Sequence, residues 1–234
     1  MPTLFTLGDS FVTGYDESIA NSYTTGKEYA FPTLVANILN LSLENLGVVG
    51  NDNEMILRDC VKISKGVQKD DIVLIVWSSP FRYQHSASVN DILINYIRQI
   101  NTANHLLKGK NILQTQAFCP LAPYEFSKEY ITQFEPENFL YWGIENNTLM
   151  DFVSNTWLDS TKTNIQRRHS NNPREWIQIL IPFLDKERKD FTKCMHFNKN
   201  GHKRVAAMIA AEIGGRFSLS PRSGHAQISK RKLM

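Results

Sequence analysis

The chain begins with a short apolar run that ends at a glycine, an aspartate and a serine. Residues 3–7 are mostly apolar, and a run of this length bounded by turn residues is typical of a buried strand. Gly8, Asp9 and Ser10 follow directly, and residues 11–27 are rich in glycine, serine, threonine and asparagine. The pattern predicts a strand that delivers Ser10 to the edge of a sheet, followed by a loop over that edge.

Predicted strands and helices alternate over the next hundred residues. Helices are predicted at residues 31–39, 54–64 and 89–107, and strands at 43–46, 71–77 and 111–118. The run at 71–77 is continuously apolar, as expected for a parallel strand that is buried on both faces. Four strands alternating with helices predict the α/β class, specifically a flavodoxin-like three-layer sandwich with a central parallel sheet.

A last helix is predicted over residues 198–213, capped by Asn198 and closed by Gly214 and Gly215. Before it, residues 124–190 combine many aromatic residues with helical spacing, which predicts a largely helical insertion. Its aromatic residues fit a core better than a ligand platform, and the segment could form a lid or an interface. We expect one domain over residues 1–215 and a tail over 216–234.

Composition and charge refine this picture. At 234 residues, 42% of them hydrophobic, the chain can bury a substantial core. Five of the 26 basic residues lie at or beyond Arg216 with no acidic residue among them, so 21 basic and 23 acidic residues remain before the tail. A basic tail of this kind can contact nucleic acid or an acidic partner, although a solvated terminus is commoner. We expect no other nucleic-acid contact.

The sequence predicts a cytoplasmic protein. It has no apolar run near the roughly 18 residues of a membrane span, and it does not begin with a basic segment followed by an apolar one. Its three cysteines, Cys60, Cys119 and Cys194, are odd in number and widely spaced, which favours a reducing compartment over a disulfide framework.

Ser10 is a candidate nucleophile, and its chemistry requires partners from elsewhere in the chain. A serine hydroxyl needs a base within hydrogen-bond reach and donors for the oxyanion that forms. His196 lies just before the last helix and is the best candidate base. The glycine-rich turn at residues 47–52 leaves backbone N–H groups at the head of a helix, so Gly50 N–H is a candidate donor beside that of Ser10.

Three segments resemble, in type and order, those of the SGNH (GDSL-type) hydrolases. They are Gly8-Asp9-Ser10, the Asn-x-Gly-x-x-Gly segment that ends at Gly50, and the His-x-Asn-x-x-Gly-His segment from His196 to His202. The resemblance implies that Ser10 is the nucleophile and His196 the base. It also implies an esterase without a cofactor that cleaves small acyl esters, including O-acetyl groups on carbohydrate, through an acyl-serine intermediate.

The sequence departs from the family pattern at two positions. Lys193 stands three residues before His196, where the family has an aspartate that orients the imidazole. Either Asp190 or a backbone carbonyl in a Ser-His dyad could take over that role.

The second departure concerns the oxyanion site. The segment after residue 76 lacks the family's asparagine and reads Trp77-Ser78-Ser79-Pro80. Asn51, Ser78 or Ser79 could replace this donor, and Arg82 could hold an anionic or sugar group of the substrate.

Two alternatives to the esterase hypothesis follow from these departures. One is a weakly active or inactive domain that serves as a binding or structural subunit, for example in a virus particle, with a second copy or an assembly partner. The other takes Cys194, His196 and His202 as zinc ligands, but three isolated residues without a second cysteine pair are a weak pattern, so we expect no metal.

Overall fold

The computed structural model describes residues 1–15, 28–80, 82, 89–117, 138, 140, 148, 149, 153, 190–192 and 196–217. Strands and helices alternate through most of this part of the chain, as predicted. Its elements are β1 (Thr3–Leu7), α1 (Ser10–Thr13), α2 (Phe31–Leu39), β2 (Ser42–Asn45), α3 (Asn53–Ser64), β3 (Ile72–Trp77), α4 (Val89–Leu106), β4 (Asn111–Gln116) and α9 (Lys199–Arg216).

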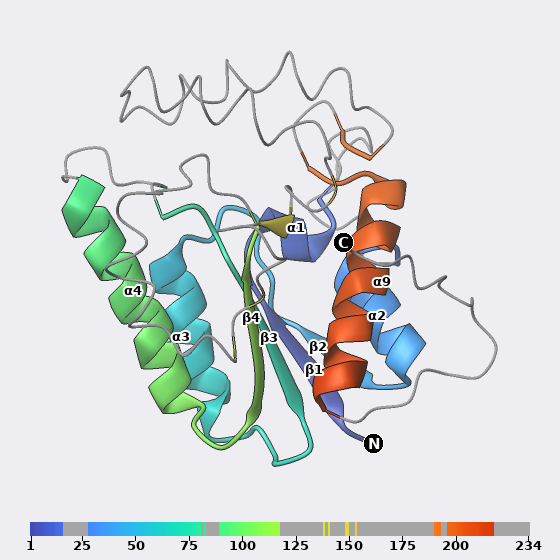
Figure 1. The fold of residues 1–234 in the computed structure, drawn as a ribbon, viewed down its shortest axis with the longest axis horizontal. Helices are drawn as coiled ribbons and strands as arrows, with labels where there is room; N and C mark the ends of the chain where they lie inside the picture. Colours follow the sequence, from blue (N-terminus) through green and yellow to red (C-terminus); the bar gives the residue numbers. More distant parts are fainter. Residues whose placement is uncertain are drawn as a thin grey trace, which may run out of the picture.

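The four strands form one parallel sheet in the order β2-β1-β3-β4. In register, Leu7 near the end of β1 lies opposite Ile75 of β3, and Trp77 at the end of β3 lies opposite Gln116 of β4. Since all four strands run in the same direction, their carboxyl ends lie at one edge of the sheet, where ligands bind in open α/β folds (Figure 1). The predicted flavodoxin-like class is confirmed.

Helices cover both faces of the sheet, and β3 shows why. Its six residues are all buried, and alternate side chains join two different apolar clusters. Ile72, Leu74 and Val76 pack with residues of α2 and α9, whereas Val73, Ile75 and Trp77 pack with residues of α3 and α4. The sheet is therefore the middle layer of a three-layer sandwich (Figure 1).

Two local predictions were wrong. Residues 11–13, predicted as the start of a loop, belong to the short helix α1, which begins after the N-cap Asp9 and ends at Gly14 with a left-handed φ of 74°. Gly214 and Gly215 do not close the last helix, because α9 continues to Arg216 and is capped at Phe217. Its buried face, which includes Val205, packs on α2 and outweighs the low helix propensity of glycine.

Three of the six described residues of the predicted insertion belong to the apolar core. Leu140 N–H donates a hydrogen bond of 2.8 Å to the carbonyl of Gln114, on the outer edge of β4. Leu140, Leu149 and Val153 are buried in the cluster that α2 and α9 form with the sheet. The remainder of residues 124–190 and the tail beyond Phe217 lie outside the described residues.

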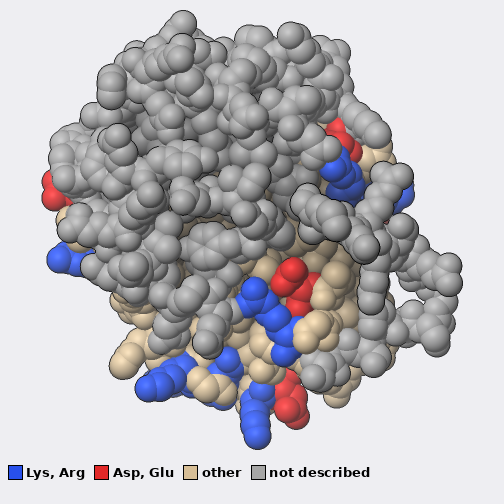
Figure 2. Space-filling view, in the orientation of Figure 1, with Lys and Arg blue, Asp and Glu red and all other residues tan. Residues whose placement is uncertain are grey.

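The described helices and surface charges can be compared with the expectations on membrane spans and charge. None of these helices combines the length and the apolar character that a bilayer crossing requires. Among the described side chains visible in Figure 2, basic and acidic ones lie near one another.

Cys60 should be inert toward alkylation in the folded protein. It is fully buried between α3 and the sheet, and this burial, with a smaller effect from the neighbouring Asp59 carboxylate, raises the pKa of the thiol to about 12. At pH 8 only about one Cys60 in ten thousand is then a thiolate, the reactive form. Iodoacetamide treatment followed by peptide mass mapping should modify Cys60 only after denaturation. Fast modification in the native protein would contradict this burial.

Candidate active site

Ser10 lies where β1 meets α1, at the carboxyl edge of the sheet. The Asp9 carboxylate caps α1 by accepting a hydrogen bond of 3.0 Å from Phe11 N–H. Gly8 allows the close approach that this turn requires, because a Cβ there would collide with the Val12 side chain and the Val76 carbonyl oxygen. Ser10 is therefore held at the first position of a short helix, and it is only 4% exposed.

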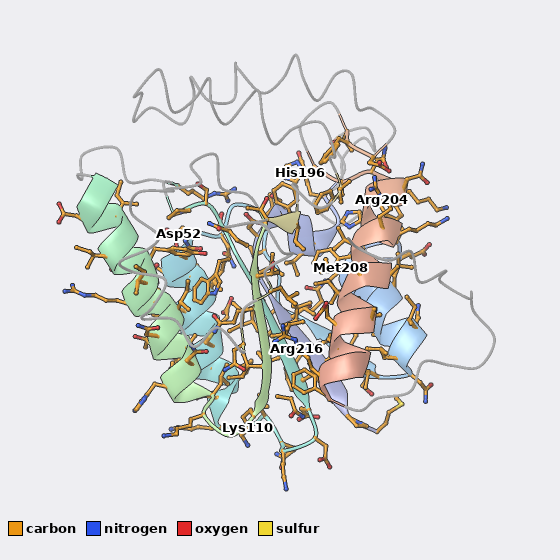
Figure 3. The ribbon with its side chains drawn as sticks, in the orientation of Figure 1. Asp52, Lys110, His196, Arg204, Met208 and Arg216 are labelled. Carbon is orange, nitrogen blue, oxygen red and sulfur yellow. The ribbon has the colours of Figure 1, made fainter. Side chains whose placement is uncertain are left out.

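His196 reaches Ser10 from the opposite end of the chain. Its Nε2 lies 2.6 Å from Ser10 Oγ, a hydrogen-bond distance. The imidazole also contacts two aromatic rings from the segment that follows β1. Its ring centroid lies 4.9 Å from that of Phe11 and 5.1 Å from that of Tyr15. In Figure 3, His196 lies next to α1 and close to the start of α9. The predicted nucleophile and base are thus in contact.

The backbone N–H groups of Ser10 and Gly50, the two predicted oxyanion donors, bond to no described residue. The loop that carries Gly50 is fixed to the end of β1, because the Gly8 carbonyl accepts from Val48 N–H at 3.1 Å and from the Asn51 amide at 3.3 Å. Gly50 itself is exposed, with a left-handed φ of 88°. Asn51, a third predicted donor, uses one of its two amide hydrogens to anchor this loop.

A buried carboxylate lies directly before the nucleophile. Asp9, 1% exposed, accepts a 2.8 Å hydrogen bond from Ser78 Oγ through Oδ2, and the Arg82 guanidinium lies 3.4 Å from the same oxygen. Ser78 N–H also donates to the Asn53 side chain at 2.8 Å. Both donors of Ser78 are therefore used within the protein, and its prediction as an oxyanion donor is not supported.

Arg82 joins three segments at this edge of the sheet. Besides Asp9, its guanidinium donates to the Asn51 carbonyl at 3.0 Å, so it ties the Gly50 loop to the strand ends. Its side chain also lines a pocket of about 190 Å³ between α3, the end of β3 and α4. The pocket is mostly polar, and its lining includes Asp52, Asn53, Ser79, Tyr96 and Gln99. In Figure 3, Asp52 lies at the upper end of α3, to the left of α1, and His196 lies above α1.

Asp190 does not orient the imidazole, contrary to one of the two hypotheses for its role. Its Oδ2 accepts a 2.5 Å hydrogen bond from Arg204 Nη1, and its buried Oδ1 accepts none from the described residues. The dyad hypothesis stays a prediction, and Lys193 lies outside the described residues.

The zinc alternative receives no support from the two histidines. His196 uses Nε2 on Ser10, and His202 Nδ1 accepts from Phe31 N–H at 3.2 Å. Cys194, the third residue of that pattern, lies outside the described residues. Among the residues that are described, no cluster of histidine, cysteine and acidic side chains could hold a metal ion.

The sequence analysis missed two features of the site. The first is the aromatic packing of Phe11 and Tyr15 on the imidazole, whose only sequence signal is their position just after Ser10. The second is the role of Asp9 as the centre of a polar network. Asp9 belongs to the Gly-Asp-Ser motif, but its partners Ser78 and Arg82 are about 70 residues away.

This combination of a parallel sheet and a serine-histidine contact at its carboxyl edge defines a hydrolase-like α/β domain. No protein-family model matches the sequence, and no curated protein sequence matches it significantly. Solved structures do match, and they identify the fold as that of the GDSL-type (SGNH) hydrolases, which confirms the resemblance at the level of fold.

Three of these structures illustrate the similarity. A lipolytic protein of the G-D-S-L family from Desulfitobacterium hafniense aligns at a TM-score of 0.52 and 13% identity, over 90% of this chain and 99% of its own. A family two carbohydrate esterase from Clostridium thermocellum gives 0.51 and 11%, over 94% and 65%. A psychrotrophic esterase from Pseudoalteromonas sp. gives 0.50 and 12%, over 93% and 100%.

The hydrogen bond from Ser78 to Asp9 should contribute measurably to stability. Replacing Ser78 with alanine leaves a buried carboxylate oxygen without its hydroxyl donor, so we expect unfolding to become easier by about 1–3 kcal/mol. Urea denaturation followed by circular dichroism measures this difference. Ser64→Ala is the matched control, because Ser64 bonds to the Val61 carbonyl in an exposed position. Equal losses in both variants would contradict the importance of the Asp9 network.

Proposed function

We propose that this protein is a serine hydrolase that cleaves small acyl esters through an acyl-Ser10 intermediate. The observation that carries the proposal is the 2.6 Å contact between Ser10 Oγ and His196 Nε2, made between residues 186 positions apart. A nucleophile in hydrogen-bond reach of a base is the arrangement that nucleophilic acyl transfer requires. The fold supports it, since the structures that share it include esterases.

The reaction proceeds in two halves. In the first, His196 Nε2 accepts the hydroxyl proton while Ser10 Oγ attacks the ester carbonyl, and the imidazolium then returns the proton to the departing alcohol. In the second, His196 takes a proton from water, the hydroxide attacks the acyl-serine carbonyl, and the proton returns to Ser10 as the carboxylic acid leaves. For Nε2 to act as the acceptor, the neutral ring must carry its proton on Nδ1.

Backbone N–H groups stabilise the oxyanion in this mechanism. The donors are those of Ser10 and Gly50, which no described residue uses, on a loop that Asn51 and Arg82 anchor. Two donors aimed at the developing charge are the usual composition of an oxyanion hole. Because they belong to the backbone, they need no asparagine after β3. In this proposal the missing family asparagine removes one donor, and the N–H groups of Ser10 and Gly50 supply the other two.

The pocket beside Arg82 fits the polar part of the substrate. Its volume of about 190 Å³ accommodates a group no larger than one sugar ring or a short acyl group, and its lining offers carboxylate, amide and hydroxyl groups. Arg82 connects the pocket to Asp9, the residue next to the nucleophile. We therefore propose polar small esters, with O-acetylated carbohydrate as the class to screen first.

Reaction with a fluorophosphonate probe tests the proposed nucleophile. The activated serine displaces fluoride from phosphorus, so we expect a single adduct on Ser10 by peptide mass mapping. Ser10→Ala should abolish labelling, and His196→Ala should lower its rate by at least about a hundredfold, because the base is lost. Hydrolysis of 4-nitrophenyl acetate should fall in parallel.

Two controls make the result specific. Ser64→Ala changes a half-buried serine at the last position of α3 and should label like the unchanged protein. Thermal unfolding should show that Ser10→Ala remains folded. If the folded, unchanged protein does not label, or if Ser10→Ala labels equally well, the hydrolase proposal fails and a non-catalytic binding or structural role takes its place.

A further inference from the structure

We propose that Asp190 and Arg204 form a clamp that positions His196 through the backbone, in place of the aspartate that the SGNH pattern has at position 193. This inference rests on the proposed function. Neither residue touches Ser10 or the reacting atoms, so both are positioning residues. The observation behind it is a pair of short segments, residues 190–192 and 196–198, which we call the hairpin and which α9 holds by an ion pair.

The hairpin is defined by backbone hydrogen bonds on both sides of His196. Phe191 and Phe197 form an antiparallel bridge. Thr192 donates to the His196 carbonyl twice, from its N–H at 2.8 Å and from its hydroxyl at 3.2 Å. Asn198 N–H donates to the Asp190 carbonyl at 3.0 Å. The backbone of His196 is therefore fixed relative to residues 190–192.

Arg204 fixes the base of this hairpin to the rest of the domain. Its guanidinium donates to Asp190 Oδ2 at 2.5 Å and to the Val153 carbonyl at 2.7 Å. Arg204 belongs to the second turn of α9, and it lies near the His196 end of the helix in Figure 3. The carboxylate of Asp190 is 9% exposed, so this pair is largely shielded on its acidic side.

The hairpin packs closely on α9. Gly201 in the first turn of α9 lies so close to Asp190 that a Cβ would collide with the Asp190 carbonyl oxygen. The base of the hairpin therefore lies directly on the helix that carries Arg204. On its other side, the rings of Phe11 and Tyr15 contact the imidazole. Loosening the clamp should therefore change the position of His196 Nε2 relative to Ser10 Oγ.

Arg204→Met tests the clamp, because it keeps an unbranched side chain but removes the donors to Asp190 and Val153. The rate constant of Ser10 modification at saturating fluorophosphonate should fall by roughly ten- to a hundredfold, as expected for a base displaced by about 1 Å. The half-saturating probe concentration should not change. Arg204→Lys, which keeps a cationic donor, should recover most of the rate. NMR of the His196 ring nitrogens should show loss of the hydrogen-bonded Nε2 signal in Arg204→Met.

The control and the alternative outcomes separate the clamp from the proposed function. Lys62→Met removes the ion pair that the exposed Lys62 makes with Asp59 on α3, far from His196 in the sequence, and should change neither readout. Asp190→Asn provides a milder variant if Arg204→Met does not fold. Unchanged His196 signals and labelling in folded Arg204→Met would overturn the clamp alone. If the protein without substitutions does not label, but the His196 signals still change in Arg204→Met, the clamp is retained and the hydrolase proposal is overturned.

Discussion

The burial of one carboxylate governs the arrangement of this site. Asp9 is almost completely removed from water, and an ionised carboxylate in that position is tolerated only if it is paired and hydrogen-bonded. Phe11 N–H, Ser78 Oγ and the Arg82 guanidinium meet this requirement. Because the three partners come from α1, the end of β3 and the segment after it, satisfying Asp9 brings those segments together. Ser10 follows Asp9 and is placed by the same bonds.

The histidine reaches the same point by a different route. Parallel strands bring their own carboxyl ends together, but His196 belongs to no strand of the sheet and depends on α9 for its position. The buried face of α9 packs against α2 in the same apolar cluster as β1. His202 adds a polar contact between the two helices, because its Nδ1 accepts a hydrogen bond from Phe31 N–H at the start of α2. The N-cap residue of α2, Ala30, has no side-chain group that could cap this end of the helix. The apolar core and this hydrogen bond thus fix α9 relative to β1, and with it the position of the hairpin beside Ser10.

Much of this fold could be predicted from local patterns, whereas the polar partners could not. The apolar run of β3 and the helical spacing of α2 report burial directly, so both elements were predicted to within a residue or two. Helix α1 was missed because four residues show no periodicity. The Ser10–His196 contact could be anticipated because both residues lie in recognisable motifs. The alternatives left open for Ser78 and Asp190 could not be decided from the sequence. The position of Ser78 at a strand end does not reveal that its hydroxyl donates to Asp9. The sequence distance between Asp190 and His196 likewise does not reveal the ion pair of Asp190 with Arg204.

The two departures from the SGNH pattern have a common physical consequence. An aspartate beside the imidazole both orients the ring and stabilises its positive charge, whereas a backbone-held hairpin can only orient it. An asparagine at the oxyanion site adds a donor, whereas Arg82 only holds in place the loop that carries one. Under the proposed function, the described contacts that stand in for both family residues hold geometry. Correct placement accounts for a large part of the barrier reduction in acyl transfer, so we propose that the site acts on reactive small esters. Esters with poor leaving groups, whose transition states develop the most charge on the imidazole and the oxyanion, should be cleaved most slowly.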